Sequence, residues 1–175
     1  MAERVMLPYF FAKYDSLNDK KICSQHIAIF EVGGRHAYIF QDLVKFLEIK
    51  SLTITDLDSV VGNHNKSCPC DLNIKDLKTT NPTIKNWFGY KDKTLFVSEI
   101  KEKYLSITSR EKSDDLENSL ITFQLPQKNE MKWGRTLEEQ FLLENKEWIV
   151  KNINDIESLQ NAIQKIKKDY NNNNL

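Results

Sequence analysis

Three residues in a short polar stretch have side chains of the kinds that bind metal ions. His64, Cys68 and Cys70 lie close together, and Cys23 and His26 are further candidate ligands elsewhere in the chain. Structural zinc takes four nitrogen or sulfur ligands in a tetrahedron. The Cys-Pro-Cys spacing lacks the spacer of two or more residues found in ordinary zinc sites, and no second ligand pair follows it. We therefore expect loop thiols and an exposed histidine, with no metal site and no cofactor.

The same stretch places a thiol near an imidazole, the pair that a cysteine nucleophile and its base would need. Catalysis by such a pair also requires a group that orients the base and donors that stabilise an oxyanion. No such pattern accompanies His64 and Cys68, and we identify no other catalytic signature. The sequence therefore predicts a protein that is not an enzyme and has no small-molecule substrate.

A group of basic residues in the middle of the chain has the charge that nucleic acid would require. Residues 61–112 carry 10 Lys/Arg against 6 Asp/Glu, a balance of +4, whereas the whole chain has a formal net charge of zero. Basic side chains contact phosphate groups and position a protein on nucleic acid. Acidic residues are interleaved with them, so a solvated surface is the alternative. The candidate nucleic-acid contacts are Lys91, Lys93, Lys101, Lys103 and Arg110.

The apolar pattern predicts two β-hairpins that would carry or adjoin these residues. Residues 27–32 and 36–40 are apolar runs on either side of Gly33-Gly34, and glycine adopts the positive φ that a tight turn requires. A helix is expected next, because Leu43 and Leu47 share one helical face. The second hairpin is expected around residues 91–93, with Trp87 and Phe88 on its first arm.

Weaker patterns predict the remaining elements. Residues 7–14 are expected to form a strand or a turn, and residues 120–125 a strand. Leu57, Val60 and Val61 fall at helical spacing, and Gly62-Asn63 is typical of a helix end. A short helix is also possible over residues 72–77.

Together these elements predict an α+β fold, a small mixed domain with two β-hairpins and packed helices followed by a C-terminal helical tail. The expected parts are an N-terminal segment (1–21), the α+β domain (22–125), a helical segment (132–170) and a disordered tail (171–175). No apolar run approaches the ~18–20 residues of a membrane helix. The odd number of cysteines, three, suits a reducing compartment. We therefore expect an intracellular protein, in the nucleus or cytoplasm of a host cell, with no membrane partner.

The C-terminal segment has a pattern typical of self-association. Thr136 and Glu139 match a capping box at its start. Apolar residues then recur every seven positions from Leu142, and the last two repeats follow the a/d pattern of a coiled coil. The stripe predicts a homodimer, and packing against its own domain is the alternative. The residues of the stripe are Ile156, Leu159, Ile163, Ile166 and Tyr170.

The order of motifs resembles that of a known viral family. The apolar run at 27–32, Gly33-Gly34, the aromatic run at 38–40 and Asp42-Leu43-Val44 are similar to the N-terminal domain of Bro proteins and their KilA-N relatives. Residues 94–99 and Ser109-Arg110 resemble a second block of that domain. The Ski/Sno/Dac domain of transcriptional regulators has a similar order of elements and is the rival resemblance.

The Bro resemblance implies a non-enzymatic viral regulatory protein that binds DNA through the basic hairpin-helix region. The alternative is a protein-protein interaction or virion scaffold protein that self-associates through its C-terminal helix. The zero net charge and the apolar tail favour this alternative. The central positive balance favours DNA binding.

Overall fold

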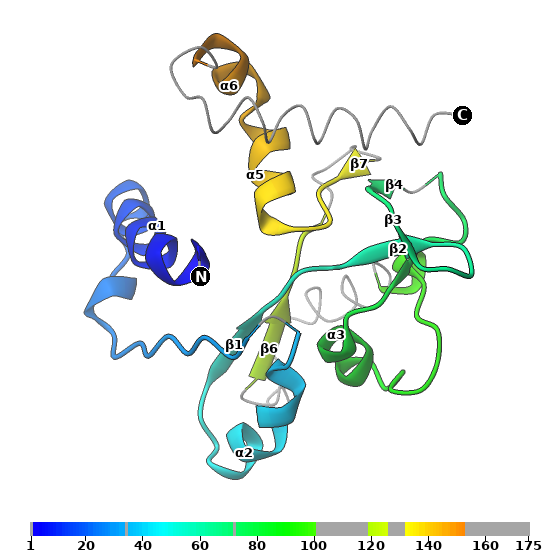
Figure 1. Ribbon diagram of the computed structural model, residues 1–175. Coiled ribbons are helices and arrows are strands. Elements are labelled where there is room, and N and C mark those ends of the chain that lie inside the picture. The colour runs from blue at the N-terminus through cyan, green and yellow to red at the C-terminus, as the bar shows by residue number, and fades with distance from the viewer. Residues whose placement is uncertain (1, 34, 72, 101–118, 126–131, 153–175) are drawn as a thin grey trace. The chain divides into compact units, whose positions relative to one another are not determined.

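The protein combines helices with short strands, and a computed structural model describes residues 2–33, 35–71, 73–100, 119–125 and 132–152 (Figure 1). This confirms the α+β class. The chain divides into two compact units, Met1–Gly34 and Arg35–Leu175. Among the described helices, none is both long enough and apolar enough to cross a membrane.

The first unit is built on helix α1 (Ala2–Asn18) and a short 3-10 helix, η1 (Ile22–Ser24). The strand or turn expected over residues 7–14 is wrong, because those residues lie inside α1. The Asp15 carboxylate accepts hydrogen bonds from the backbone N–H groups of Ile22 and Cys23 at 2.9 and 2.8 Å. These bonds close the chain back onto the end of α1, and the one from Cys23 lowers the pKa of Asp15 most.

The hairpin predicted around Gly33-Gly34 does not form. Residues 27–33 contain no strand, and Ala37–Phe40 form a 3-10 helix, η2, that leads into α2 (Gln41–Phe46). Gly33 does have a positive φ of 62°. The backbone groups of the aromatic run, however, form hydrogen bonds within a 3-10 helix and not with a partner strand. The N–H of Ile39, for example, donates to the carbonyl of His36 at 3.1 Å. Helix α2 confirms the helix predicted from Leu43 and its neighbours.

A parallel pair of strands joins distant parts of the second unit. Strand β1 (Ser51–Ile54) pairs with β6 (Ser119–Thr122), and Leu52 lies opposite Leu120 in the register. The N–H of Thr55 extends this pairing by donating to the Thr122 carbonyl at 3.1 Å. Strand β6 confirms the strand predicted near residue 120. Figure 1 shows β1 and β6 side by side.

The segment after β1 forms a hairpin where a helix was expected. Strand β2 (Ser59–Val61) lies between β3 (Lys66–Ser67) and β5 (Lys78–Thr79), antiparallel to both. Gly62 has a φ of 71°, the left-handed conformation that the sequence predicted, but it begins the β2–β3 turn and does not end a helix. A two-stranded sheet of β4 (Cys70–Asp71) and β7 (Lys132–Trp133) follows. No helix forms over the described residues between 73 and 77.

The second predicted hairpin is replaced by helix α3 (Pro82–Trp87). Asn81 caps this helix and Pro82 occupies its first position, where a missing N–H costs nothing. Trp87 therefore ends a helix and is not on a hairpin arm. Farther along, residues 97–100 are helical, and Phe96 makes an isolated bridge to Lys78.

Two short helices end the described part of the chain, α5 (Leu137–Glu144) and α6 (Lys146–Asn152). Thr136 caps α5 as predicted, with its side-chain oxygen accepting from the Glu139 N–H at 3.3 Å. The Glu139 carboxylate bonds to Arg135 on both backbone and side chain, one residue earlier than a standard capping box would place it.

The core of the second unit collects side chains from β4, β6 and β7, from α3 and from the segments that connect the strands. Leu57, Ile84, Leu95 and Trp133 are each at most 1 % exposed. Cys68 and Cys70 belong to the same buried cluster. The core therefore underlies the turn that follows β1.

Candidate functional site

Two carboxylates flank a core leucine at the point where β1 ends. Leu57 is 1 % exposed, and Asp56 and Asp58 on either side of it are partly exposed. Asp58 has a φ of 50°, in the left-handed region that residues other than glycine adopt at some cost. Backbone strain of this kind concentrates at functional sites. The turn Asp56–Asp58 is therefore the first candidate.

Neighbouring segments bond to the backbone of this turn through both its N–H groups and its carbonyls. The N–H groups of Leu57 and Asp58 donate to the Arg135 carbonyl at 3.1 and 3.3 Å. On the acceptor side, the Thr79 hydroxyl donates to the Leu57 carbonyl at 2.6 Å, and Thr80 donates to the Asp58 carbonyl through both its N–H and its hydroxyl. The turn is thus fixed by Thr79 at the end of β5, by Thr80 after it, and by Arg135, two residues before α5 begins.

Asp56 faces the start of α5. Its Oδ1 accepts from the N–H of Leu137 at 3.0 Å and from the side-chain amide of Gln124 at 2.9 Å. The other end of the Gln124 amide accepts from the Leu57 N–H at 3.1 Å. Burial raises the pKa of Asp56 more than these bonds lower it, and the charges of Glu138 and Asp58 raise it further.

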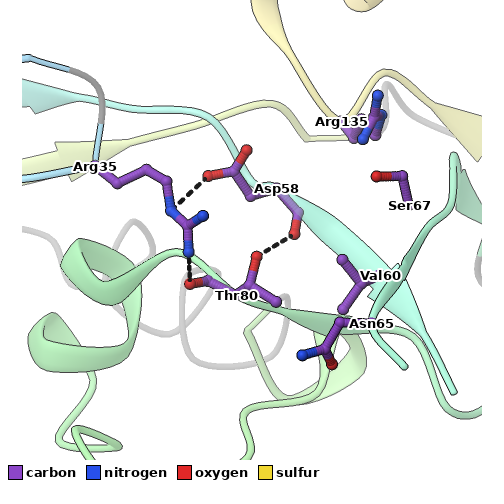
Figure 2. A pocket seen from close by; sticks show the side chains of 7 residues that line it. All are labelled: Arg35, Asp58, Val60, Asn65, Ser67, Thr80 and Arg135. Carbon is purple, nitrogen blue, oxygen red and sulfur yellow. Dashed lines mark hydrogen bonds and ion pairs between the residues drawn. The ribbon is translucent and has the colours of Figure 1, made fainter. Parts of the chain in front are cut away.

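Asp58 faces an arginine. Its Oδ2 lies 3.3 Å from Nε of Arg35 and 3.4 Å from the side-chain nitrogen of Asn81. Figure 2 shows Arg35 reaching both this carboxylate and the carbonyl of Thr80. Burial raises the pKa of Asp58, although Arg35 and Arg135 lower it. Both carboxylates are thus less stable as anions than they would be in water, a condition that a bound cation would relieve.

A cavity of about 390 Å³ opens beside Asp58 (Figure 2). Such a volume falls within the ~300–1,000 Å³ of small-molecule sites. Two arginines and one carboxylate supply its charge, and most of its other lining is polar. The lining residues are Arg35, Asp58, Val60, Asn65, Ser67, Thr80 and Arg135.

The donor chemistry of the turn fits a hard divalent cation. Mg²⁺ is bound through oxygen atoms, with one or two protein carboxylates and the remaining positions taken by water or substrate phosphate. Asp56 and Asp58 provide two carboxylates, two residues apart on one turn. Across the described residues no cluster of three or more His, Cys, Asp or Glu side chains meets metal-site geometry. The pair therefore suits a cation that shares its coordination with a ligand.

The basic residues predicted from the sequence are only partly within the described chain. Lys91 and Lys93 lie exposed in the turn after α3 and do not line the cavity. Lys101, Lys103 and Arg110 lie outside the described residues, so a joint contact surface stays a prediction. The dimer stripe, Ile156, Leu159, Ile163, Ile166 and Tyr170, also lies outside them and stays a prediction.

The cysteines differ from the expected loop thiols. His64 is exposed on the β2–β3 turn, but Cys68 and Cys70 are 2 % and 0 % exposed in the core. Burial raises the pKa of the Cys70 thiol to about 12 and raises that of Cys68. Strand β4 begins at Cys70, directly after Pro69, so Cys70 lies in a strand and not in a loop.

This burial predicts how the thiols react. In the folded protein at pH 8, a thiol reagent such as dithionitrobenzoate is expected to modify only the exposed Cys23, because Cys68 and Cys70 are inaccessible and protonated. After unfolding in guanidinium chloride, all three cysteines should react. The absorbance of the released thionitrobenzoate gives both counts. Rapid reaction of two or three thiols in the native protein would contradict the buried placement.

Sequence reasoning missed the residues that make this site. The helical spacing of Leu57, Val60 and Val61 predicted a helix, although β-branched residues followed by two alternating carboxylates also describe a strand that ends in an acidic turn. Arg35, Gln124 and Arg135 carried no local signal. They reach the site only in the folded chain. Gln124 follows β6, which pairs with β1, Arg135 accepts from the turn through its carbonyl, and Arg35 forms an ion pair with Asp58.

Comparison with known proteins points away from the viral regulators. The sequence model of the TOPRIM domain of overcoming lysogenization defect protein-like proteins matches residues 1–58, a segment that includes Asp56 and Asp58. Endonuclease GajA from Bacillus cereus (strain HuB5-5) is 27 % identical over 151 residues, which cover 83 % of this chain. The chain spans 18 % of the length of that relative. No solved structure matches the chain.

These findings correct the family and the function expected from the sequence. The resemblance to Bro, KilA-N and Ski/Sno/Dac domains is wrong, because the matching family model is the TOPRIM domain. The expectation of a non-enzymatic regulator or scaffold is overturned as well, because the similar protein is named as an endonuclease. The motifs behind the resemblance are short, and the hairpin that carried them is absent from the structure.

Proposed function

We propose that this chain is a nuclease that hydrolyses phosphodiester bonds in nucleic acid with the help of a divalent cation. The observation that carries the proposal is the turn Asp56–Asp58, where two partly buried carboxylates follow a parallel strand inside the segment matched by the TOPRIM model. The similarity to an endonuclease supports the same chemistry.

Asp56 and Asp58 are the residues that would hold the cation. A divalent cation held there would neutralise charge on the phosphate in the transition state and lower the pKa of a bound water. The chain itself keeps the two carboxylates in place through Gln124, Leu137 and Arg135. Because both pKa values are raised by burial, binding a cation also removes an unfavourable charge environment.

The cavity beside Asp58 is where a phosphate of the nucleic acid would lie. Arg35 and Arg135 present planar guanidinium groups, whose paired N–H donors match phosphate oxygens. Arg135 is oriented by an ion pair between its Nε and Oε1 of Glu139 at 2.9 Å. Since Asp58 and Glu139 offset the two arginines, phosphate binding is expected to require the cation.

A cleavage assay with DNA and with RNA tests the proposal. The 175-residue chain is incubated with supercoiled plasmid DNA and with single-stranded RNA, in Mg²⁺, in Mn²⁺ and in EDTA. We expect one substrate to be cut in a cation-dependent way, with products resolved by electrophoresis. Intact DNA and RNA under every condition, or equal cleavage in EDTA, would contradict the proposal.

Removing the charge of either cavity arginine is expected to weaken nucleic-acid binding and to change its dependence on salt. Arg35→Gln and Arg135→Gln should each weaken nucleic-acid binding in Ca²⁺, and each should lower the slope of log K against log salt by about one phosphate contact. Fluorescence anisotropy across a salt series measures both quantities. Lys146→Gln, on the exposed surface of α6, is the matched control and should leave the slope unchanged.

The double variant Lys91→Gln/Lys93→Gln compares this surface with the one predicted from the sequence. If the slope of log K against log salt falls in that variant but not in the arginine variants, the nucleic acid contacts the turn after α3 and not the cavity. Unchanged slopes in both arginine variants would contradict phosphate binding in the cavity.

A further inference from the structure

One buried amide connects the carboxylate turn to helix α3. Asn81 is 0 % exposed. Its side-chain nitrogen donates to the Asp56 carbonyl at 2.7 Å, to the Thr55 hydroxyl at 2.9 Å and to Oδ2 of Asp58 at 3.4 Å. These three acceptors belong to the end of β1 and the turn that follows it. The amide therefore touches the backbone of one carboxylate residue and the side chain of the other.

The oxygen of the same amide faces the opposite way. It accepts from the N–H groups of Thr83 and Ile84 at 2.9 and 3.3 Å, and so caps α3. The backbone N–H of Asn81 donates in turn to the Thr79 hydroxyl at 3.0 Å, which itself bonds to the Leu57 carbonyl. The side-chain amide and the backbone N–H of Asn81 thus form hydrogen bonds with the turn, with β5 and with α3.

Only one orientation of the amide satisfies these neighbours. Exchanging its oxygen and nitrogen would set the oxygen against the Asp58 carboxylate and the Asp56 carbonyl, and would set the NH₂ group against two N–H donors. Buried polar groups left without partners cost free energy, so the observed orientation is strongly preferred. Asn81 therefore acts as a fixed spacer between α3 and the turn.

The turn needs such a restraint because its conformation is unfavourable on its own. Asp58 has a φ of 50°, in the left-handed region that residues other than glycine adopt at a cost in free energy. Rigid supporting contacts keep the two carboxylates in the cation-binding geometry before the cation binds. Carboxylates that are held loosely bind a cation with lower affinity.

We propose that Asn81 is a positioning residue that holds Asp56 and Asp58 in the geometry required for cation binding. This inference rests on the proposed nuclease function of the pair. It assigns to Asn81 no contact with the cation or with nucleic acid. Its effect passes through the Asp56 carbonyl, the Thr55 hydroxyl and the Asp58 carboxylate.

Two substitutions separate this role from helix capping. Asn81→Ser keeps a side-chain oxygen that caps α3, because serine is as good a cap as asparagine, but it lacks the amide donors to the turn. Asn81→Ala loses both. We expect both variants to bind Mn²⁺ about tenfold more weakly, as expected for disturbed support of a metal ligand. Only Asn81→Ala should also lose the cap and melt at a distinctly lower temperature than Asn81→Ser.

Ile84→Val is the control for general loosening of α3, since Ile84 is 0 % exposed in the hydrophobic cluster and its side chain has no hydrogen-bonding group. It should lower the melting temperature and leave Mn²⁺ affinity unchanged. Calorimetric titration well below each melting temperature gives the affinities. Wild-type affinity in Asn81→Ser, or equal loss in Ile84→Val, would overturn the positioning role. A wild type that binds no Mn²⁺ would overturn the proposed function itself. Should Asn81→Ala fail to fold, Asn81→Ser decides.

Discussion

Replacing Asp58 with asparagine is expected to lower the rate of nucleic-acid cleavage at least ~100-fold, because it removes a charged ligand from the proposed two-carboxylate cation site. Asparagine has nearly the same shape and keeps an oxygen near Arg35 and Asn81. The melting temperature should change little, since burial already disfavours the charged form of Asp58. Asp56→Asn should behave similarly, with its oxygen still accepting from Leu137 and Gln124.

Asp92→Asn is the matched control for these two substitutions, because Asp92 is exposed in the turn after α3 and contributes nothing to the cavity. Initial cleavage rates at saturating Mg²⁺, together with melting curves, distinguish a lost ligand from a lost fold. Wild-type rates in Asp58→Asn would show that the turn is not catalytic. An equal loss in Asp92→Asn would assign the effect to overall charge.

The largest effect on stability is expected at Trp133. This residue is 1 % exposed on β7 and lies opposite Cys70 in the β4–β7 pair. Trp133→Ala should lower the free energy of unfolding by about 3–5 kcal/mol, the usual cost of removing a buried aromatic side chain. Because β7 ends two residues before Arg135, whose carbonyl holds the carboxylate turn, that variant should also cleave nucleic acid more slowly.

Trp133→Phe should be much less damaging. Among the described residues, the indole N–H of Trp133 finds no hydrogen-bond acceptor, so it is buried at a cost that phenylalanine does not incur. Urea denaturation followed by circular dichroism gives the free energies without relying on tryptophan fluorescence. If Trp133→Phe is as unstable as Trp133→Ala, the indole N–H contributes a bond of its own and the packing argument is wrong.

Local signals in the sequence predicted some elements well. Helix α2 was predicted from its apolar face, and the cap at Thr136 was predicted from the capping box that Thr136 and Glu139 match. Gly62 was correctly expected to be left-handed. The helix predicted before Gly62 was wrong, and strand β2 forms there. The spacing of Leu57, Val60 and Val61 fits one face of a helix as well as it fits a buried turn and strand.

The site could not be predicted in the same way, because its parts are distant in sequence. Strand β1 pairs with β6 across 68 residues, and the bond from Leu137 to Asp56 spans 81. Asn81 carried a recognisable signal, Asn-Pro at a helix start, but nothing local indicated that its other end holds the carboxylate turn. Only the fold brings Arg35, Asp58 and Arg135 to one cavity.

The central claim is that Asp56 and Asp58 together bind a divalent cation, and a Mn²⁺ titration of the wild-type chain beside the double variant Asp56→Asn/Asp58→Asn tests it most directly. Calorimetry at pH 7.5, with both proteins shown to be folded by circular dichroism, gives the stoichiometry and the affinity. The wild type is predicted to bind Mn²⁺ at a site that the double variant has lost. A wild type that binds no Mn²⁺, or a double variant that binds it as tightly as the wild type, would contradict the claim.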